Sequence, residues 1–372
     1  VSYVLRGNMT DNQNFSTPDG EVENTWLKEY DFQGGLKYQS EKYSSDLRLS
    51  VNISELGIPE GEEGHDDHDD HEGHDDHEGH EGHYQELSHT MLTWKNNFDL
   101  GNNHDLEITL GRQFNERKEF GGHGEEEGHE GHGDHEGHDD HGHGGSGAEL
   151  DMELTTNTID IALTMPQSDN FNMILGSNIL SQENKNFGFE ELIPDADMND
   201  FGIYGLGQIT MENGSALIGV RYDSRSIKSE MGSADFSNFN GSIGLKRNLG
   251  NASLRLNLGS GYRAPNLIEL FAEGIHHGTF RYERGNPNLE AETSFQSEIS
   301  LDLSDEDSSL AFDVFYNDIS NYIYVAPSNE AVAGYKLYNF LQQNATLWGS
   351  EIIYSKQTLS LIHISEPTRL QQ

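Results

Sequence analysis

Residues 261–292 read GYRAPNLIELFAEGIHHGTFRYERGNPNLEAE, and the stretches on either side of them have the two-residue period of β-strands. Leucine occupies every second position of 254–258, and isoleucine or leucine does so in 299–303, with polar or charged residues between them. Because successive side chains of a strand point to opposite faces, each stretch has one apolar and one polar face. The sequence therefore predicts a long loop, 264–292, between two amphipathic strands.

The same period recurs along the whole chain, and no stretch has a convincing helical period. Strands are predicted at 1–6, 26–38, 42–53, 86–98, 105–118, 149–164, 171–183, 199–211, 215–229, 237–247, 252–263, 293–303, 309–324, 337–344 and 349–359. Short turns alternate with longer connections at 7–25, 54–85, 119–148, 184–198, 230–236, 264–292 and 325–336. This alternation is typical of a transmembrane β-barrel, whose strands need only about 9–11 residues each. A soluble antiparallel sandwich has strands of the same period, but it gives no reason for long and short connections to alternate by side.

The 261–292 segment also resembles part of a known family. In the barrel of TonB-dependent outer-membrane receptors, a YRAPxxxEL segment leaves one strand and an NPxLxPE segment opens the next. The residues that match these two segments are Tyr262, Arg263, Ala264, Pro265, Glu269, Asn286, Pro287, Leu289 and Glu292. Ala291 departs from the pattern, because it stands where the family commonly has Pro. The resemblance covers about 1–359, with the specific motifs in the last third. We expect Arg263 to have a structural role, forming an ion pair in the lumen or with the plug.

The resemblance implies an all-β fold, an antiparallel transmembrane β-barrel that crosses the outer membrane of a Gram-negative bacterium many times. About fifteen of the family's twenty-two strands are visible, so we predict a partial barrel whose plug domain is missing. We expect one domain, 1–359, with histidine-rich extracellular loops at about 61–85 and 121–147. Residues 360–372 resemble the translated read-through of a sequencing adaptor. No signal peptide is visible, so we expect the natural N-terminus to lie upstream.

Composition excludes several classes of partner and activity. The formal net charge is -43 at pH 7, whereas a nucleic-acid partner requires a basic face. Cysteine is absent, which excludes thiolate metal ligands, disulfides and cysteine nucleophiles. No run approaches the ~20 apolar residues of a membrane helix. No motif of a serine hydrolase, a zinc protease or a P-loop is present, so we expect neither an enzyme nor a catalytic cofactor.

Histidine recurs at every third position of one segment and at close spacing in a second. The first set is His65, His68, His71, His74, His77, His80 and His83, and the second is His123, His129, His132, His135, His138, His141 and His143. Imidazole and carboxylate without thiolate suit Zn²⁺, and also Ni²⁺, Cu²⁺ or Co²⁺. We predict metal binding of high capacity and modest affinity, which is lost as pH falls through about 6 because only neutral imidazole binds. The alternative is a solvated acidic segment without a specific ligand.

A further candidate metal site lies inside the 264–292 loop. Glu273, His276 and His277 are close in sequence, with Glu283 a few residues later. Adjacent histidines of a strand point to opposite faces, so both could reach one ion only across a turn. Ordinary surface polar residues are the alternative interpretation.

With its histidine-rich loops the chain is similar to the zinc-uptake branch of the family, and this resemblance implies an outer-membrane receptor that captures Zn²⁺ or a related divalent metal at those loops for TonB-energised uptake. Zn²⁺ is then the transported ligand. The expected partners are outer-membrane lipid, the metal, and the TonB energy-coupling complex through the missing N-terminal region. Two alternatives remain: a receptor of the same family for a metal chelate, siderophore or haem, and a non-transporting surface protein that buffers metal.

Overall fold

The computed structural model describes residues 1–18, 20–59, 83–120, 148–188, 191–276, 279 and 281–357. Within these residues the chain forms a 16-stranded sheet and a separate two-stranded ribbon. The long strands of the sheet are β1 (Ser2–Asn12), β4 (Leu27–Gln39), β5 (Tyr43–Gly57), β6 (Tyr84–Gly101), β7 (His104–Phe120), β8 (Leu150–Ser168), β9 (Phe171–Asn186), β10 (Ala196–Met211), β11 (Gly214–Ser229), β12 (Gly232–Leu249), β13 (Ala252–Arg263), β16 (Glu292–Ser304), β17 (Ser308–Val332) and β18 (Tyr335–Lys356). The short elements are β2 (Ser16–Thr17), β3 (Gly20–Glu21), α1 (Leu267–Phe271), β14 (Glu273–His276) and β15 (Arg281–Arg284).

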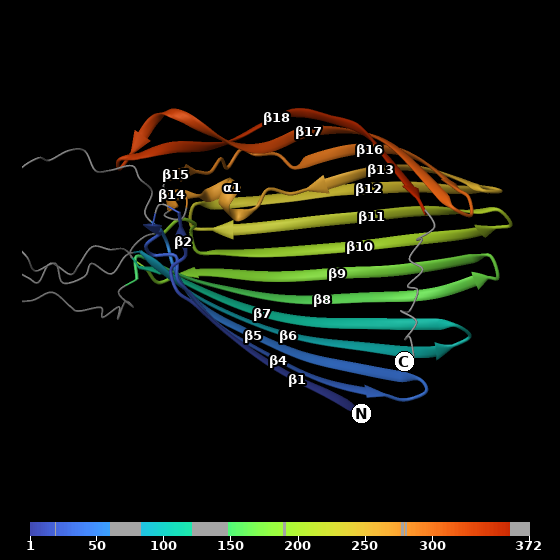
Figure 1. Cartoon of the computed structure of the whole chain (residues 1–372), viewed down its shortest axis with the longest axis horizontal. Coiled ribbons are helices and arrows are strands. Elements are labelled where there is room, and N and C mark those ends of the chain that lie inside the picture. The colour runs from blue at the N-terminus through green and yellow to red at the C-terminus, as the bar shows by residue number, and fades with distance from the viewer. Residues whose placement is uncertain are drawn as a thin grey trace, which may run out of the picture.

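Each long strand pairs antiparallel with the long strands before and after it in the chain, and the sheet curves into an open trough (Figure 1). One pairing departs from this order, because β15 lies parallel to the start of β18, with Arg281 opposite Lys336. Among the residues that the structure describes, β1 and β18 do not pair with each other. The all-β prediction is therefore confirmed, and the sheet is the wall of a partial, unclosed barrel.

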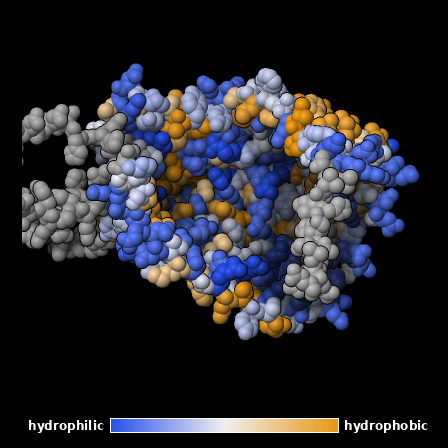
Figure 2. Space-filling view, in the orientation of Figure 1, coloured by the Kyte–Doolittle hydropathy of each residue, from blue (hydrophilic) through white to orange (hydrophobic). Residues whose placement is uncertain are grey.

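The two faces of the sheet differ in polarity. One face carries a row of apolar register partners across seven strands: Leu36, Leu47, Trp94, Leu110, Ile159, Ile179 and Phe201. Most members of this row are exposed. The other face is concave, and Figure 2 shows its hollow lined largely by hydrophilic residues. Apolar residues outside and polar residues inside are the arrangement that a barrel in lipid requires.

The two ends of the sheet carry unequal connections. At one end the strands are joined by tight turns, such as the one in which Asn102 and Asn103 adopt left-handed conformations with φ of 54° and 60°. The opposite end, here called the rim, carries α1, β14 and β15 in Figure 1. The longer connections between successive strands at the rim are 13–26, 58–83, 121–149, 187–195 and 264–291.

The prediction of a loop at 325–336 is wrong. Strand β17 continues almost to the start of β18, and only Ala333 and Gly334 separate the two. For the same reason the strands predicted at 337–344 and 349–359 form one strand, as far as the structure describes them. Both turn residues have positive φ, 50° and 86°, as a type I′ hairpin turn requires, and alanine rarely adopts such a conformation. Gly334 suits such a turn, but Ala333 stands where Asn, Asp or Gly is favoured, so only half of the usual turn signal is present.

Three other connections also differ from the prediction. Strand β12 begins at Gly232, so the loop predicted at 230–236 shrinks to two residues. Strand β1 continues to Asn12, and the predicted 7–25 loop contains the β2–β3 ribbon. The 264–292 loop contains a helix, α1, and a small hairpin, β14–β15. Long and short connections therefore do alternate by side, but not every rim connection is long.

A cluster of buried apolar side chains lies just inside the rim. Its buried members are Ile227, Leu270, Phe271, Leu289 and Ile323, which come from β11, α1, the 285–291 connection and β17. Leu270 is only 1% exposed. The cluster packs the 264–291 segment against the inner side of the sheet.

Candidate metal site at the rim

Helix α1 is short, but its first turn is capped in both directions. The Asn266 side chain accepts a hydrogen bond from the Glu269 backbone N–H at 2.8 Å, and the Glu269 carboxylate accepts one from the Asn266 N–H at 2.8 Å. Such a capping box stabilises the start of a helix. The spacing of these two residues is the sequence signal for this helix, which is too short to show a helical period. The helix directs Leu270 and Phe271 into the apolar cluster.

Arg263, the last residue of β13, ties the two ends of the segment together. Its Nη1 donates to both carboxylate oxygens of Glu269 at 2.8 and 2.9 Å. Its Nε and Nη2 donate to the two oxygens of Glu292 at 2.8 and 2.6 Å. Glu292 also accepts from the Ile323 backbone N–H at 2.6 Å. Such forked, charge-assisted bonds fix geometry as well as contributing energy, so these three motif residues brace the segment.

The remaining motif residues are part of the same frame. Tyr262 lines a cavity on the concave face. Ala264, Pro265 and Leu289 are buried, Pro287 lies in an exposed turn, and the Asn286 N–H donates to the Glu269 carbonyl at 2.8 Å. Gly285 is needed for close packing, because a Cβ there would lie 2.6 Å from backbone atoms of Leu270 and Phe271.

One face of the β14–β15 hairpin holds a histidine beside a buried carboxylate. His276 Nδ1 lies 3.1 Å from Glu283 Oε1, and Arg281 Nε donates to the same oxygen at 2.7 Å. The Glu283 residue is 3% exposed. The hydrogen bond from His276, assisted by Arg281, holds the pKa of the Glu283 carboxyl below its ordinary value although burial opposes this. A carboxylate can only accept, so Nδ1 of His276 is the donor and Nε2 is the atom available to a metal.

The other face of the hairpin holds Glu273, which is engaged by different partners. Arg284 Nε and the Tyr282 hydroxyl each lie 3.2 Å from its carboxylate. In the register of the hairpin Glu273 is opposite Arg284, whereas His276 is opposite Arg281. Glu273 and His276 therefore lie on opposite faces and do not converge on one ion. His277 lies outside the described residues, and among those described no group of three His, Asp or Glu residues could hold a metal ion.

The ends of the first histidine-rich connection are clamped at the rim. The Ile58 N–H donates to the His83 carbonyl at 2.8 Å, and the side-chain amide of Asn24 donates to the carbonyls of both residues. Asn24 has a left-handed φ of 56°, which is uncommon outside glycine. The other members of that set lie outside the described residues: His65, His68, His71, His74, His77 and His80.

The second histidine-rich connection begins beside the first. Tyr84 is the register partner of Phe120, and their rings stack at 4.5 Å between centroids. Below them, the buried Gln85 side chain donates to Glu119 at 2.8 Å. The histidines of this second set lie outside the described residues: His123, His129, His132, His135, His138, His141 and His143.

None of the described residues forms a helix long and apolar enough to cross a membrane. A search of curated proteins found no match. Solved structures with the same fold include the copper transporter OprC (TM-score 0.71, 12% identity, 96% of this chain and 54% of that chain). A double mutant of the Serratia marcescens hemophore receptor HasR, in complex with its hemophore HasA and heme, matches at TM-score 0.67 and 10% identity, over 95% of this chain and 56% of that one. The FrpB iron transporter of Neisseria meningitidis (F3-3 variant) matches at TM-score 0.66 and 15% identity, over 96% and 55%.

This chain therefore spans little more than half the length of the solved structures it resembles, and at such identities the likeness shows the fold alone. The family assignment rests on the sequence, because the family model described as TonB dependent receptor-like, beta-barrel matches residues 24–362. The members of this family are receptors and transporters of the Gram-negative outer membrane rather than enzymes. With more than nine-tenths of its length covered by that match, the chain belongs to the TonB-dependent receptor β-barrel family.

Proposed function

We propose that this chain is barrel wall from an outer-membrane transporter that captures Zn²⁺, or a related divalent metal, at its histidine-rich rim and imports it with energy from TonB. The proposal places the protein in the zinc-uptake branch of its family. Outer-membrane lipid contacts the apolar row on the outer face, and the TonB complex and the metal are its other partners.

One observation carries the proposal: the strand ends that flank both histidine-rich connections lie side by side at the rim. The strands β5, β6, β7 and β8 are consecutive in the sheet. The first connection joins β5 to β6 and the second joins β7 to β8, while Tyr84 of β6 and Phe120 of β7 are direct register partners. Fourteen histidines are thereby attached to neighbouring strands at one end of the barrel wall.

His276 is the described residue best suited to take the metal onward. Its ring is oriented by the buried Glu283, an arrangement that fixes the tautomer of metal-binding histidines. A single imidazole holds a zinc ion weakly, which suits transient transfer rather than storage. Glu273, on the opposite face of the hairpin, has no part in this step.

The test is zinc accumulation in cells that express the full-length gene. One variant replaces the fourteen histidines of the two connections by asparagine, which keeps length and acidic charge. The matched control replaces fourteen Asp and Glu residues of the same connections by Asn and Gln and keeps every histidine. We expect the histidine variant to lose most uptake at scarce zinc and little at abundant zinc, and the control to lose much less at scarce zinc.

Three outcomes would contradict the proposal. Equal losses in the histidine variant and the control would show that acidity rather than imidazole gathers the ion. Unchanged zinc uptake together with uptake of a chelate or haem would indicate a receptor for that compound. No uptake at all, with zinc retained at the cell surface, would indicate a buffering protein.

A further inference from the structure

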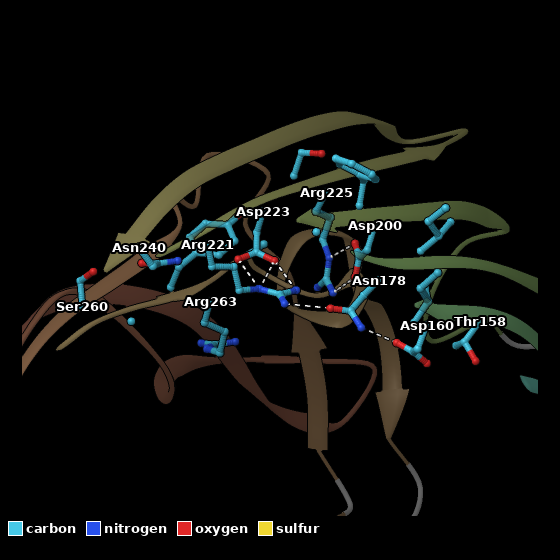
Figure 3. A pocket seen from close by; sticks show the side chains of 18 residues that line it. Thr158, Asp160, Asn178, Asp200, Arg221, Asp223, Arg225, Asn240, Ser260 and Arg263 are labelled. Atoms are coloured by element: carbon cyan, nitrogen blue, oxygen red, sulfur yellow. Dashed lines mark hydrogen bonds and ion pairs between the residues drawn. The ribbon is translucent and has the colours of Figure 1, made fainter. Parts of the chain in front are cut away.

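The concave face contains a cavity of about 620 Å³, inside the range of about 300–1,000 Å³ that is usual for ligand sites. Strands β8 to β11 contribute most of the charged and amide side chains that line it, and Figure 3 shows these turned toward one another. The six that matter here are Asp160, Asn178, Asp200, Arg221, Asp223 and Arg225.

Two of the three aspartates of the cavity, Asp200 and Asp223, are paired with arginines of the wall itself, and the third, Asp160, accepts from an amide. Arg225 donates through Nε and Nη2 to the two oxygens of Asp200 at 2.7 and 2.6 Å. Arg221 Nε lies 2.7 and 2.9 Å from the two oxygens of Asp223. Nη1 of the same arginine donates to the Asn178 carbonyl oxygen at 2.8 Å, and the Asn178 amide donates in turn to Asp160. The Arg225–Asp200 and Asn178–Asp160 pairs join neighbouring strands, and Arg221 and Asp223 belong to one strand, whereas the Arg221–Asn178 bond runs from β11 to β9 across Gly202 of β10.

The position of Arg221 is built by the packing around it. Its guanidinium lies 5.5 Å from the centre of the Tyr204 ring. A Cβ at Gly176 would collide with that ring, and a Cβ at Gly202 would collide with the guanidinium itself. Two glycines on neighbouring strands therefore leave the space that the arginine and its aromatic support occupy, so the pairing with Asp223 is part of the fold.

Unpaired carboxylates in a partly enclosed polar cavity are suited to divalent cations, because they are hard oxygen ligands in a medium of lowered dielectric. A carboxylate in a fork with a guanidinium has its charge balanced and one lone pair of each oxygen occupied, so it attracts a cation less strongly. We propose that the Asp200–Arg225 and Asp223–Arg221 pairs prevent the inner wall from retaining the divalent metal, so that an ion released at the rim passes this part of the lumen without capture. The inference rests on the proposed function, since it concerns the same cargo.

The test compares a variant that lacks only the arginine of a pair with one that lacks both charges of the pair. Arg225→Gln leaves Asp200 without its counter-ion, whereas Arg225→Gln with Asp200→Asn removes both charges. We expect zinc uptake per surface-exposed receptor to fall about tenfold in the single variant, the ratio equivalent to about 1.4 kcal/mol of added retention. The double variant should recover most of that loss. Arg255→Gln is the matched control, because Arg255 pairs with Asp302 outside the cavity, and it should leave uptake unchanged.

Equal uptake in the single and double variants would overturn the inference, whether that uptake is normal or reduced. If the pair only stabilised the fold, removing Asp200 as well as Arg225 would not restore uptake. Arg221→Gln with and without Asp223→Asn repeats the test on the second pair if the first single variant does not reach the cell surface. The histidine variant described above tests the proposed function separately. If uptake depends on those histidines but not on whether Asp200 is paired with Arg225, the inference is wrong and the proposed function stands.

Discussion

The 264–291 segment and the two histidine-rich connections leave the same rim, but they differ in what can attach them to the sheet. The segment contributes Leu270, Phe271 and Leu289 to a buried cluster and is braced by Arg263. By contrast, 60–82 and 121–147 contain no residue of the apolar types. The family motif of this chain is therefore a structural frame, while most of its histidines belong to segments without apolar side chains.

The largest expected effect comes from removing an anchor. Leu270→Ala deletes a side chain that is 1% exposed and should cost about 2–5 kcal/mol in the local stability of the segment. Hydrogen–deuterium exchange of 264–276 in the purified receptor measures this as lost protection. Ile268→Ala is the matched control, because the same helix leaves Ile268 36% exposed. Equal losses in both variants would show that the cluster does not hold the segment.

A smaller effect is expected from the ionic brace. Arg263→Gln leaves Glu269 and Glu292 without their guanidinium, and hydrogen bonds to charged groups contribute about 1.5–3 kcal/mol. Exchange should accelerate at both ends of the segment together. Arg284→Gln breaks the more exposed pair with Glu273 and should cost at most about 1 kcal/mol. If Arg263→Gln and Arg284→Gln accelerated exchange equally, Arg263 would not brace the segment.

Acid should loosen the hairpin while the apolar anchors remain. The pKa of Glu283 is held below its ordinary 4.5 in the folded state, mainly by the hydrogen bond from His276. The folded hairpin then binds fewer protons than the unfolded one, so this contribution is complete above about pH 4.5 and is lost as pH falls below it. Exchange protection of 273–284, corrected for the intrinsic rate at each pH, should show this loss. Glu283→Gln should remove the pH dependence, and a dependence that survives the substitution would assign it elsewhere.

The smallest structural effect is expected from the histidines themselves. Replacing those of 60–82 and 121–147 by asparagine should change the thermal stability of the receptor by no more than about 0.5 kcal/mol, as for surface substitutions, while zinc bound per receptor falls sharply. Calorimetry and zinc titration of the same samples measure the two quantities. A large loss of stability would remove the contrast between the two kinds of rim segment.

The two-residue period predicted most strands of the sheet, because one apolar face is required whether that face meets lipid or a core. The capping pair Asn266 and Glu269 could have predicted α1. Other features could not be read from the sequence. The partners of Arg263 come from two different elements, and the separation of Glu273 from His276 depends on the register of a short hairpin. Such relations are set by packing rather than by local pattern.

Among the strands that the structure describes, one pairing is parallel, that of β15 with β18, and it bears on the order of assembly. Every long strand meets its neighbour in the chain, so the wall can grow one hairpin at a time from contacts of short range. Strand β15 can join the sheet only later, because Arg281 pairs with Lys336, which follows β16 and β17 in the chain. We expect pulse-labelled receptor to gain protection at 281–284 only after 292–332 is protected. This part of the rim would then be the last part of the wall to form. A receptor whose synthesis stopped before β18 would have its earlier strands in place but a rim without the β15–β18 pairing.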